Sequence, residues 1–107
     1  MKLVMAIMGN EDTPAVMEGL TDAKFQVTKL ATTGGFLKAG NTTLIIGVED
    51  VKVSKVIDII SKYSSKRVQT ITNPASMYNA NLVAMPFQIT SGGAIIFVLN
   101  VEQFEKI

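Results

Sequence analysis

The feature that most constrains the fold of this chain is a short pattern that occurs twice. Residues 5–12 read MAIMGNED and residues 43–50 read TLIIGVED, so in each copy an apolar run precedes a glycine and an acidic pair. A continuous apolar run is typical of a strand covered on both faces, and negative charge is favoured at the start of a helix. Each copy therefore predicts a strand followed by a helix, and the repeat predicts two similar halves.

The first half continues with a helix and a second strand. Asp12 or Thr13 is expected to cap the helix, because Pro14 follows in the first turn, where a missing N–H costs nothing. In residues 25–30 apolar and polar side chains alternate, as they do in a half-exposed strand.

The second half repeats this order. Glu49 and Asp50 are expected to cap and open a helix whose apolar stripe consists of Val53, Val56, Ile57, Ile60 and Tyr63. Residues 67–71 then predict a fourth strand. The order β-α-β, β-α-β predicts an α+β, ferredoxin-like fold, in which both helices lie on one face of an antiparallel sheet.

The C-terminal part adds to this core. Residues 73–84 are rich in proline and asparagine signals and are expected to form a loop. Residues 94–98 predict an extra C-terminal strand, which forms a hairpin if it pairs with residues 87–90. Residues 101–107 form a short amphipathic segment.

The composition indicates one small domain with an apolar surface. Of its 107 residues, 48% are apolar and only 18% are charged, which leaves little charge to cover a monomer, so we expect a homo-oligomer. A trimer that buries the free sheet faces is one solution. The net charge is +1 and the basic residues are scattered except for Lys66-Arg67, so DNA and RNA are not expected partners. That pair is either a phosphate clamp or, as we favour, a solvated strand end.

Several kinds of chemistry are excluded by missing residue types. The sequence has no cysteine and no histidine, which excludes thiol and imidazole catalysis, disulfides and nearly all zinc chemistry. We expect neither catalytic nor metal-binding residues. The apolar run near the N-terminus is too short for a signal peptide or a membrane span, so a cytoplasmic protein without a membrane partner is expected.

A glycine-rich segment between two predicted strands favours a purine ligand. The Asn41 amide offers a donor and an acceptor to an adenine edge, and Phe36 offers a ring for stacking. Backbone N–H groups at Gly34, Gly35 and Gly40 suit phosphate oxygens. The segment does not fit the spacing of a Walker A loop. Alternatively, the glycines only form turns and the Phe36-Leu37 pair packs at a subunit contact.

The same segment resembles a known family. Residues 27–43 read VTKLATTGGFLKAGNTT and are similar to the signature of the PII-like cyclic-di-AMP receptor proteins (PstA type) of Gram-positive bacteria. The resemblance continues in GVED at 47–50 and GGAIIFVL at 92–99, and covers effectively the whole chain. It implies a single PII-like domain over residues 1–107, assembled as a homotrimer, without catalytic activity. It also implies a small loop at about 34–41 and a large loop at about 73–85.

The ligand-binding positions that the resemblance implies are Gln26, Thr28, Gly35, Phe36, Leu37, Asn41, Gly47, Gly92, Gly93 and Phe97. Thr28 would donate a hydroxyl hydrogen bond, and residues 35–37 would line an adenine. Asn41 would bind an adenine edge, and Gly47 would let the backbone approach the ligand. The last three positions would form the wall that a neighbouring subunit supplies to the cleft.

The chain departs from the family pattern in places that bear on affinity. Gln26 stands where the family usually has arginine, Lys24 where it has asparagine, and Lys106 where it has glutamine, and the large loop differs. Loss of the arginine removes roughly 1.5–3 kcal/mol of charged hydrogen bonding. Lys24 or Lys106 is able to compensate in part.

Three classes of function follow. The favoured one is a signal-transduction protein in which cyclic-di-AMP, bound between subunits, rearranges the loops and so changes recognition of an unidentified protein partner. The second is a PII-like sensor of ATP or ADP, or one that has lost its ligand. The third, an acylphosphatase-like enzyme, is disfavoured because the only arginine, Arg67, is far in sequence from the glycine-rich turn.

Overall fold

The protein folds around one four-stranded sheet with a separate two-stranded arm. The computed structural model describes residues 1–30, 40–72 and 86–107. The predicted small and large loops therefore lie almost entirely outside the described residues. The elements are β1 (Lys2–Gly9), α1 (Thr13–Asp22), β2 (Val27–Leu30), β3 (Asn41–Val48), a 3-10 turn η1 (Asp50–Lys52), α2 (Val53–Ser64), β4 (Arg67–Thr72), β5 (Pro86–Ser91) and β6 (Ala94–Asn100).

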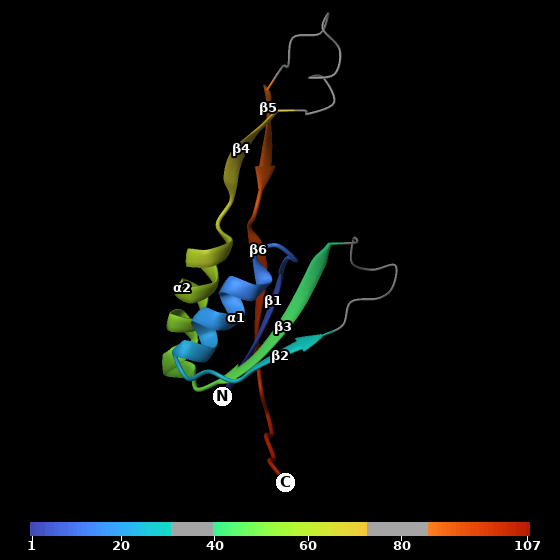
Figure 1. Ribbon diagram of the computed structural model, residues 1–107. Coiled ribbons are helices and arrows are strands. Elements are labelled where there is room, and N and C mark those ends of the chain that lie inside the picture. The colour runs from blue at the N-terminus through green and yellow to red at the C-terminus, as the bar shows by residue number, and fades with distance from the viewer. Residues whose placement is uncertain (31–39, 73–85) are drawn as a thin grey trace, which may run out of the picture.

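The main sheet has the strand order β2-β3-β1-β6 and is antiparallel throughout. β1 is a central strand that pairs along its whole length with β3, from Lys2 opposite Val48 to Gly9 opposite Asn41. Both helices lie on the same face of this sheet (Figure 1). The predicted α+β, ferredoxin-like architecture is confirmed.

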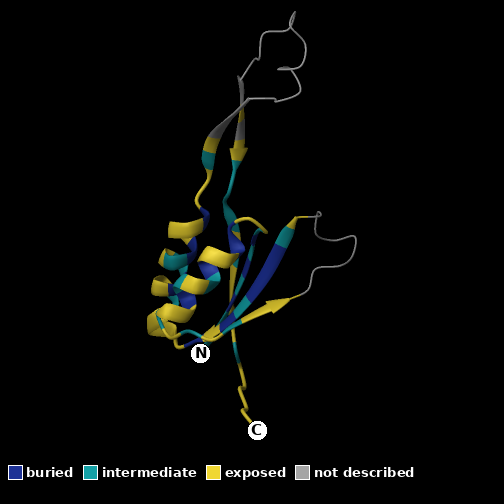
Figure 2. Ribbon diagram, viewed as in Figure 1, coloured by how far each residue is buried: buried dark blue, intermediate teal, exposed yellow. Residues whose placement is uncertain are grey.

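The core lies between the sheet and the helices. Alternate residues of the two central strands face the helices and are buried, namely Val4, Ala6, Met8, Leu44, Ile46 and Val48. The helices contribute the buried side chains of Val16, Leu20, Val56 and Ile60. Burial of each large aliphatic side chain contributes about 1.5–3 kcal/mol. Figure 2 shows the buried residues gathered on the inner sides of both layers.

The two helices approach each other closely at Gly19. A Cβ atom added at this position would lie 2.7 Å from the Tyr63 ring and 3.1 Å from Ile59. The glycine therefore allows α1 to pack directly against the aromatic end of α2's apolar stripe.

The fourth strand of the core sheet differs from the sequence prediction. Residues 67–71 were expected to fill this place, but β4 pairs with β5 and forms an arm that extends away from the core (Figure 1). The fourth position is taken by β6, which pairs with β1, so the predicted extra strand at residues 94–98 is confirmed, and the alternative in which it forms a hairpin with residues 87–90 is wrong. The physical reason is composition: β6 begins with an unbroken apolar run, whereas β4 has only two apolar residues, Val68 and Ile71, among polar ones.

The helix starts are also built differently from the prediction. Asp12 occupies the N-cap position of α1 but makes no capping hydrogen bond through its side chain. Thr13 Oγ1 instead donates a hydrogen bond of 3.0 Å to the Gly9 carbonyl. At the second helix neither acid caps α2, because η1 precedes it, and the Asp50 carboxylate lies 2.9 Å from the Met1 amino group.

The C-terminal tail continues beyond β6 without a regular element. The Val101 N–H donates a hydrogen bond to the Met1 carbonyl, and the chain then leaves the sheet (Figure 1). Phe104 and Ile107 on this tail are exposed.

Candidate functional site

The face of the sheet opposite the helices carries two predicted site residues at its two edges. Thr28 on β2 pairs with Ile45, which pairs with Met5, which pairs with Phe97 on β6. The four residues form one row on one face, and adjacent strands are about 4.8 Å apart, so Thr28 and Phe97 are separated by about 14 Å. Within one protomer they therefore cannot contact the same adenine ring.

This open face is strongly apolar. By strand register it carries, besides the residues of that row, Leu3, Ile7, Ile95 and Leu99. The β6 members of the face are roughly half exposed: Ile95 60%, Phe97 51% and Leu99 45%. Soluble monomers rarely expose a continuous apolar surface of this kind, so the face is suited to contact another protein surface.

Two further predicted site residues lie beside Thr28. Gly47 is exposed on the open face, and a Cβ atom added there would meet nothing within 4 Å. No contact within the described protomer therefore requires a glycine at this position. Gln26 is exposed and directly precedes Val27, which pairs with Ile46, the neighbour of Gly47.

A second group of predicted site residues meets in a cavity of about 760 Å³ at the base of the arm. The cavity brings together Asn41 at the start of β3 with Gly92 and Gly93 between β5 and β6. Its other lining residues are Ile7, Met8, Gly9, Glu11, Lys66, Thr90, Ser91, Ala94 and Ile95. The structure thus brings three of the predicted residues together within one protomer, whereas the resemblance implied that Gly92 and Gly93 belong to the wall supplied by a neighbouring subunit. The sequence prediction did not include Glu11, Lys66, Thr90 or Ser91.

The glycine pair of this cavity is also required by the backbone. Gly92 and Gly93 have φ angles of +84° and +94°, a region that side chains rarely tolerate. A Cβ atom at Gly92 would lie 2.4 Å from the Ser65 carbonyl oxygen and 2.9 Å from Arg67 Nη1. The Gly93 N–H donates a hydrogen bond to the Ser64 carbonyl. The pair therefore allows the chain to cross the end of α2 closely, whether or not it also contacts a ligand.

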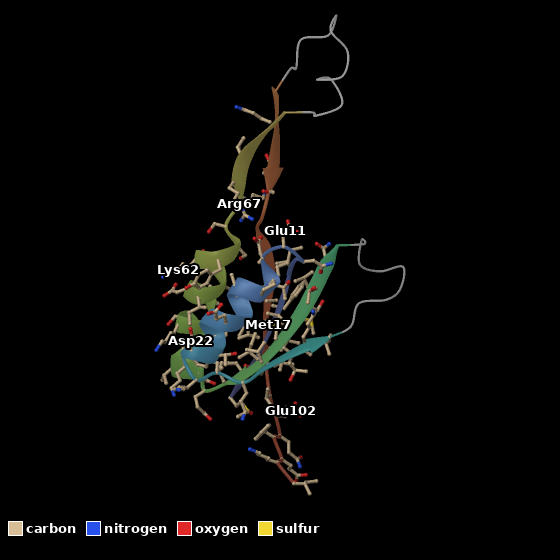
Figure 3. All side chains as sticks on the ribbon, in the orientation of Figure 1. Glu11, Met17, Asp22, Lys62, Arg67 and Glu102 are labelled. Carbon is tan, nitrogen blue, oxygen red and sulfur yellow. The ribbon has the colours of Figure 1, made fainter. Side chains whose placement is uncertain are left out.

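An ion pair fixes the base of the arm to the core. Arg67 Nη2 donates to Asp12 Oδ1 at 2.7 Å, and the Asp12 side chain is only 5% exposed. Hydrogen bonding to this carboxylate raises the pKa of the Arg67 guanidinium above its usual value. Figure 3 shows Arg67 and Glu11 at this junction. The sequence prediction missed the pair, because no spacing signal connects two residues from separate halves.

A second hollow, of about 640 Å³, lies beside the start of α1. It is lined by Asn10, Thr13, Pro14, Met17, Lys29, Leu30 and Thr42, and contains none of the predicted site residues. Thr42 donates a hydrogen bond to the Asn10 side chain here.

Three predicted positions, Gly35, Phe36 and Leu37, lie outside the described residues. Among the described helices, none is long and apolar enough to cross a membrane.

The fold and the open face define a PII-like protein built on a ferredoxin-like core. A model of the cyclic-di-AMP receptor family matches residues 1–107, and the chain belongs to this family. It is also similar to a solved structure of a functionally unknown protein from Pediococcus pentosaceus, with 39% identity and a TM-score of 0.80. That similarity covers 99% of this chain and 96% of the other. The family match supports a binding role in signalling, with cyclic-di-AMP as the family's ligand.

Proposed function

We propose that this chain is a non-enzymatic signal-transduction protein that binds cyclic-di-AMP in the clefts between the subunits of a homotrimer. Ligand occupancy is relayed to an unidentified protein partner through rearrangement of the loops. The proposal includes the cytoplasmic location expected from the sequence.

The observation that carries this proposal is the position of the predicted ligand residues at opposite edges of one sheet. Thr28 and Phe97 lie in the same row but about 14 Å apart, three strand spacings. A site that uses both residues needs the β2 edge of one protomer beside the β6 edge of another. The apolar open face between the edges gives such an assembly a surface to bury, and the exposed Phe104 and Ile107 of the tail add to it.

The described groups suit a ligand with adenine rings and phosphates. Thr28 offers a hydroxyl and Asn41 an amide, which is able both to donate to and to accept from an adenine edge. The backbone around the exposed Gly47 is open to close approach by a neighbour or a ligand. The proposal also includes adenine stacking on residues 35–37, which is predicted only from the family resemblance.

The relay requires that the ligand bind one arrangement of the loops better than another, because equal affinity for both states shifts no equilibrium. The cavity with Asn41 lies at the base of the arm, and the arm leads to the segment 73–85. Ligand contacts at this base are therefore well placed to change how the segment is held.

Calorimetry with the purified protein tests the proposal, in parallel with light scattering for the oligomeric state. We expect saturable binding of one cyclic-di-AMP per protomer and the mass of a trimer. A monomer, or the absence of heat with ligand at tens of micromolar, contradicts it.

Gln26, in place of the family's usual arginine, favours a second candidate: a sensor of ATP or ADP, or a protein without a ligand. A thermal-shift panel separates these candidates, since a ligand at about 100 times its dissociation constant stabilises the fold by about 2.7 kcal/mol. A shift with ATP or ADP, without one from cyclic-di-AMP, supports the second candidate.

A further inference from the structure

The cavity at the base of the arm contains one basic residue among its lining residues, Lys66. This residue directly follows α2 and precedes β4, and its side chain is exposed. In the part of the chain that the structure describes, Lys66 forms no ion pair. Its positive charge is therefore available to a ligand in the cavity.

The neighbouring cation is occupied. Arg67 is held by Asp12 at 2.7 Å and also donates to the Ser65 carbonyl at 3.3 Å. The two basic residues that are adjacent in sequence thus have different roles: the charge of Arg67 is compensated by a buried carboxylate, and that of Lys66 is not.

The backbone of Gly93 supports the position of Lys66 at the cavity. A Cβ atom on Gly93 would lie 3.1 Å from Lys66 Cγ and 3.6 Å from Cε. The aliphatic part of the lysine therefore packs over the glycine backbone, and a side chain at position 93 would crowd it. Burial of the stem with an exposed ammonium is the usual arrangement of a lysine at the rim of a site.

On this basis, and resting on the proposed function, we propose that Lys66 binds a phosphate of the nucleotide ligand. A cyclic dinucleotide carries two phosphodiester charges, and an ammonium is a strong donor to phosphate oxygens.

Glu11 makes the proposal testable in both directions. It lines the same cavity, and its carboxylate lies over Gly9, where an added Cβ atom would be 2.8 Å from Oε1. Because like charges repel, the Glu11 carboxylate disfavours binding of an anionic ligand in the cavity, whereas Lys66 favours it. The two side chains therefore have opposite expected effects on the affinity for the same ligand.

The experiment measures cyclic-di-AMP affinity by calorimetry for the wild type, Lys66→Gln, Glu11→Gln and the control Lys62→Gln. Lys62 is exposed on α2, where its ammonium lies 5.3 Å from the Tyr63 ring centroid, and it does not line the cavity. We expect Lys66→Gln to weaken binding about three- to tenfold and Glu11→Gln to strengthen it about twofold, since both side chains are exposed and screened. Lys62→Gln is expected to leave the affinity unchanged.

The dependence on salt gives a second readout. Wild-type binding is expected to weaken as salt rises, and binding by Lys66→Gln to depend on salt less. Lys66→Arg, which keeps the charge, is expected to retain most of the affinity, which separates loss of charge from damage to the fold.

The outcomes are distinguishable. Equal affinity of Lys66→Gln and the wild type overturns the inference, and so does weakening by Lys66→Gln and Glu11→Gln alike, because damage to the arm base acts in one direction only. If the wild type itself binds no cyclic-di-AMP, the proposed function is wrong. That result comes from the wild type alone and is therefore distinct from a result in which only the Lys66 inference is wrong.

Discussion

Three glycines differ in how strongly the local backbone and its neighbours exclude a side chain. We therefore predict that replacing each with alanine changes the stability of the protein to a different extent. A Cβ atom at Gly47 meets nothing within 4 Å among the described residues, and this glycine has no positive φ. Gly40 has a φ of +101°, and a Cβ atom there also meets no described residue within 4 Å. Gly92 combines a φ of +84° with a Cβ position only 2.4 Å from the Ser65 carbonyl oxygen. The series therefore separates backbone strain from steric overlap.

The expected changes in the free energy of unfolding follow from backbone strain and steric overlap. Alanine at Gly47 is expected to cost nothing and to stabilise by up to about 0.5 kcal/mol, because it restricts the unfolded chain. Alanine at Gly40 costs about 1–2 kcal/mol for the left-handed backbone. At Gly92 the same strain adds to an overlap of about 1–3 kcal/mol, which gives about 2–5 kcal/mol in all.

Urea unfolding of the ligand-free protein measures these differences. All variants are compared at one protomer concentration, because assembly couples stability to concentration. For a domain of this size, a loss of about 2 kcal/mol also lowers the melting temperature by at least about 8 °C. The Gly47→Ala variant serves as the matched control for the substitution itself.

One result refutes the reasoning. If Gly92→Ala is no less stable than Gly40→Ala, the chain at the end of α2 moves aside for a methyl group. The close crossing of this chain over Ser65 would then not be the reason for the glycine.

The remaining predictions concern assembly, ligand and pH. Phe97→Asp is expected to convert the proposed trimer to monomers in light scattering, because it places a charge in the open face; an unchanged mass contradicts this. Thr28→Val and Asn41→Ala are each expected to weaken cyclic-di-AMP binding about three- to tenfold in calorimetry, the loss of one hydrogen bond; equal affinity contradicts the roles. The Met1 amino group lowers the pKa of Asp50 below 3.8, so their pair stabilises the fold above that pH and is lost as pH falls through the lowered pKa. The stability difference between the wild type and Asp50→Asn is therefore expected to be smaller at pH 2 than at pH 6; an identical difference at both contradicts it.

The sequence predicts the core well, because periodicity and repetition are local signals. The apolar runs around Ala6 and Leu44 and the helical stripe through Val56 and Ile60 all face the same interior. These patterns depend only on neighbouring residues, so reading them requires no knowledge of strand pairing.

Strand pairing and ion pairs were harder to predict, because they join distant segments. Residues 67–71 have the pattern of a strand, but the pattern does not state whether the partner is β1 or β5. An acid before a helix usually suggests a cap, and only the folded chain brings Arg67 to Asp12. The sequence shows Lys66 only as half of a basic pair, because the ion pair that distinguishes Arg67 from Lys66 forms between segments that are distant in sequence.

For the candidate site, the motif resemblance predicts positions but does not predict which of them lie together in one protomer. Asn41, Gly92 and Gly93 meet in one cavity, whereas Thr28 and Phe97 lie at opposite sheet edges. In the proposed function, Thr28 and Phe97 meet only through assembly, and no local pattern in the sequence of one chain encodes that contact.

The central position of β1 has a consequence for biosynthesis. Its first residues pair with the last residues of β6, Lys2 opposite Asn100, so one side of β1 stays without its neighbour until β6 has been made. Pairings between such distant segments slow folding, and an unpaired strand edge is a template for other chains. The nascent protein is therefore expected to be most prone to aggregate before β6 docks on β1.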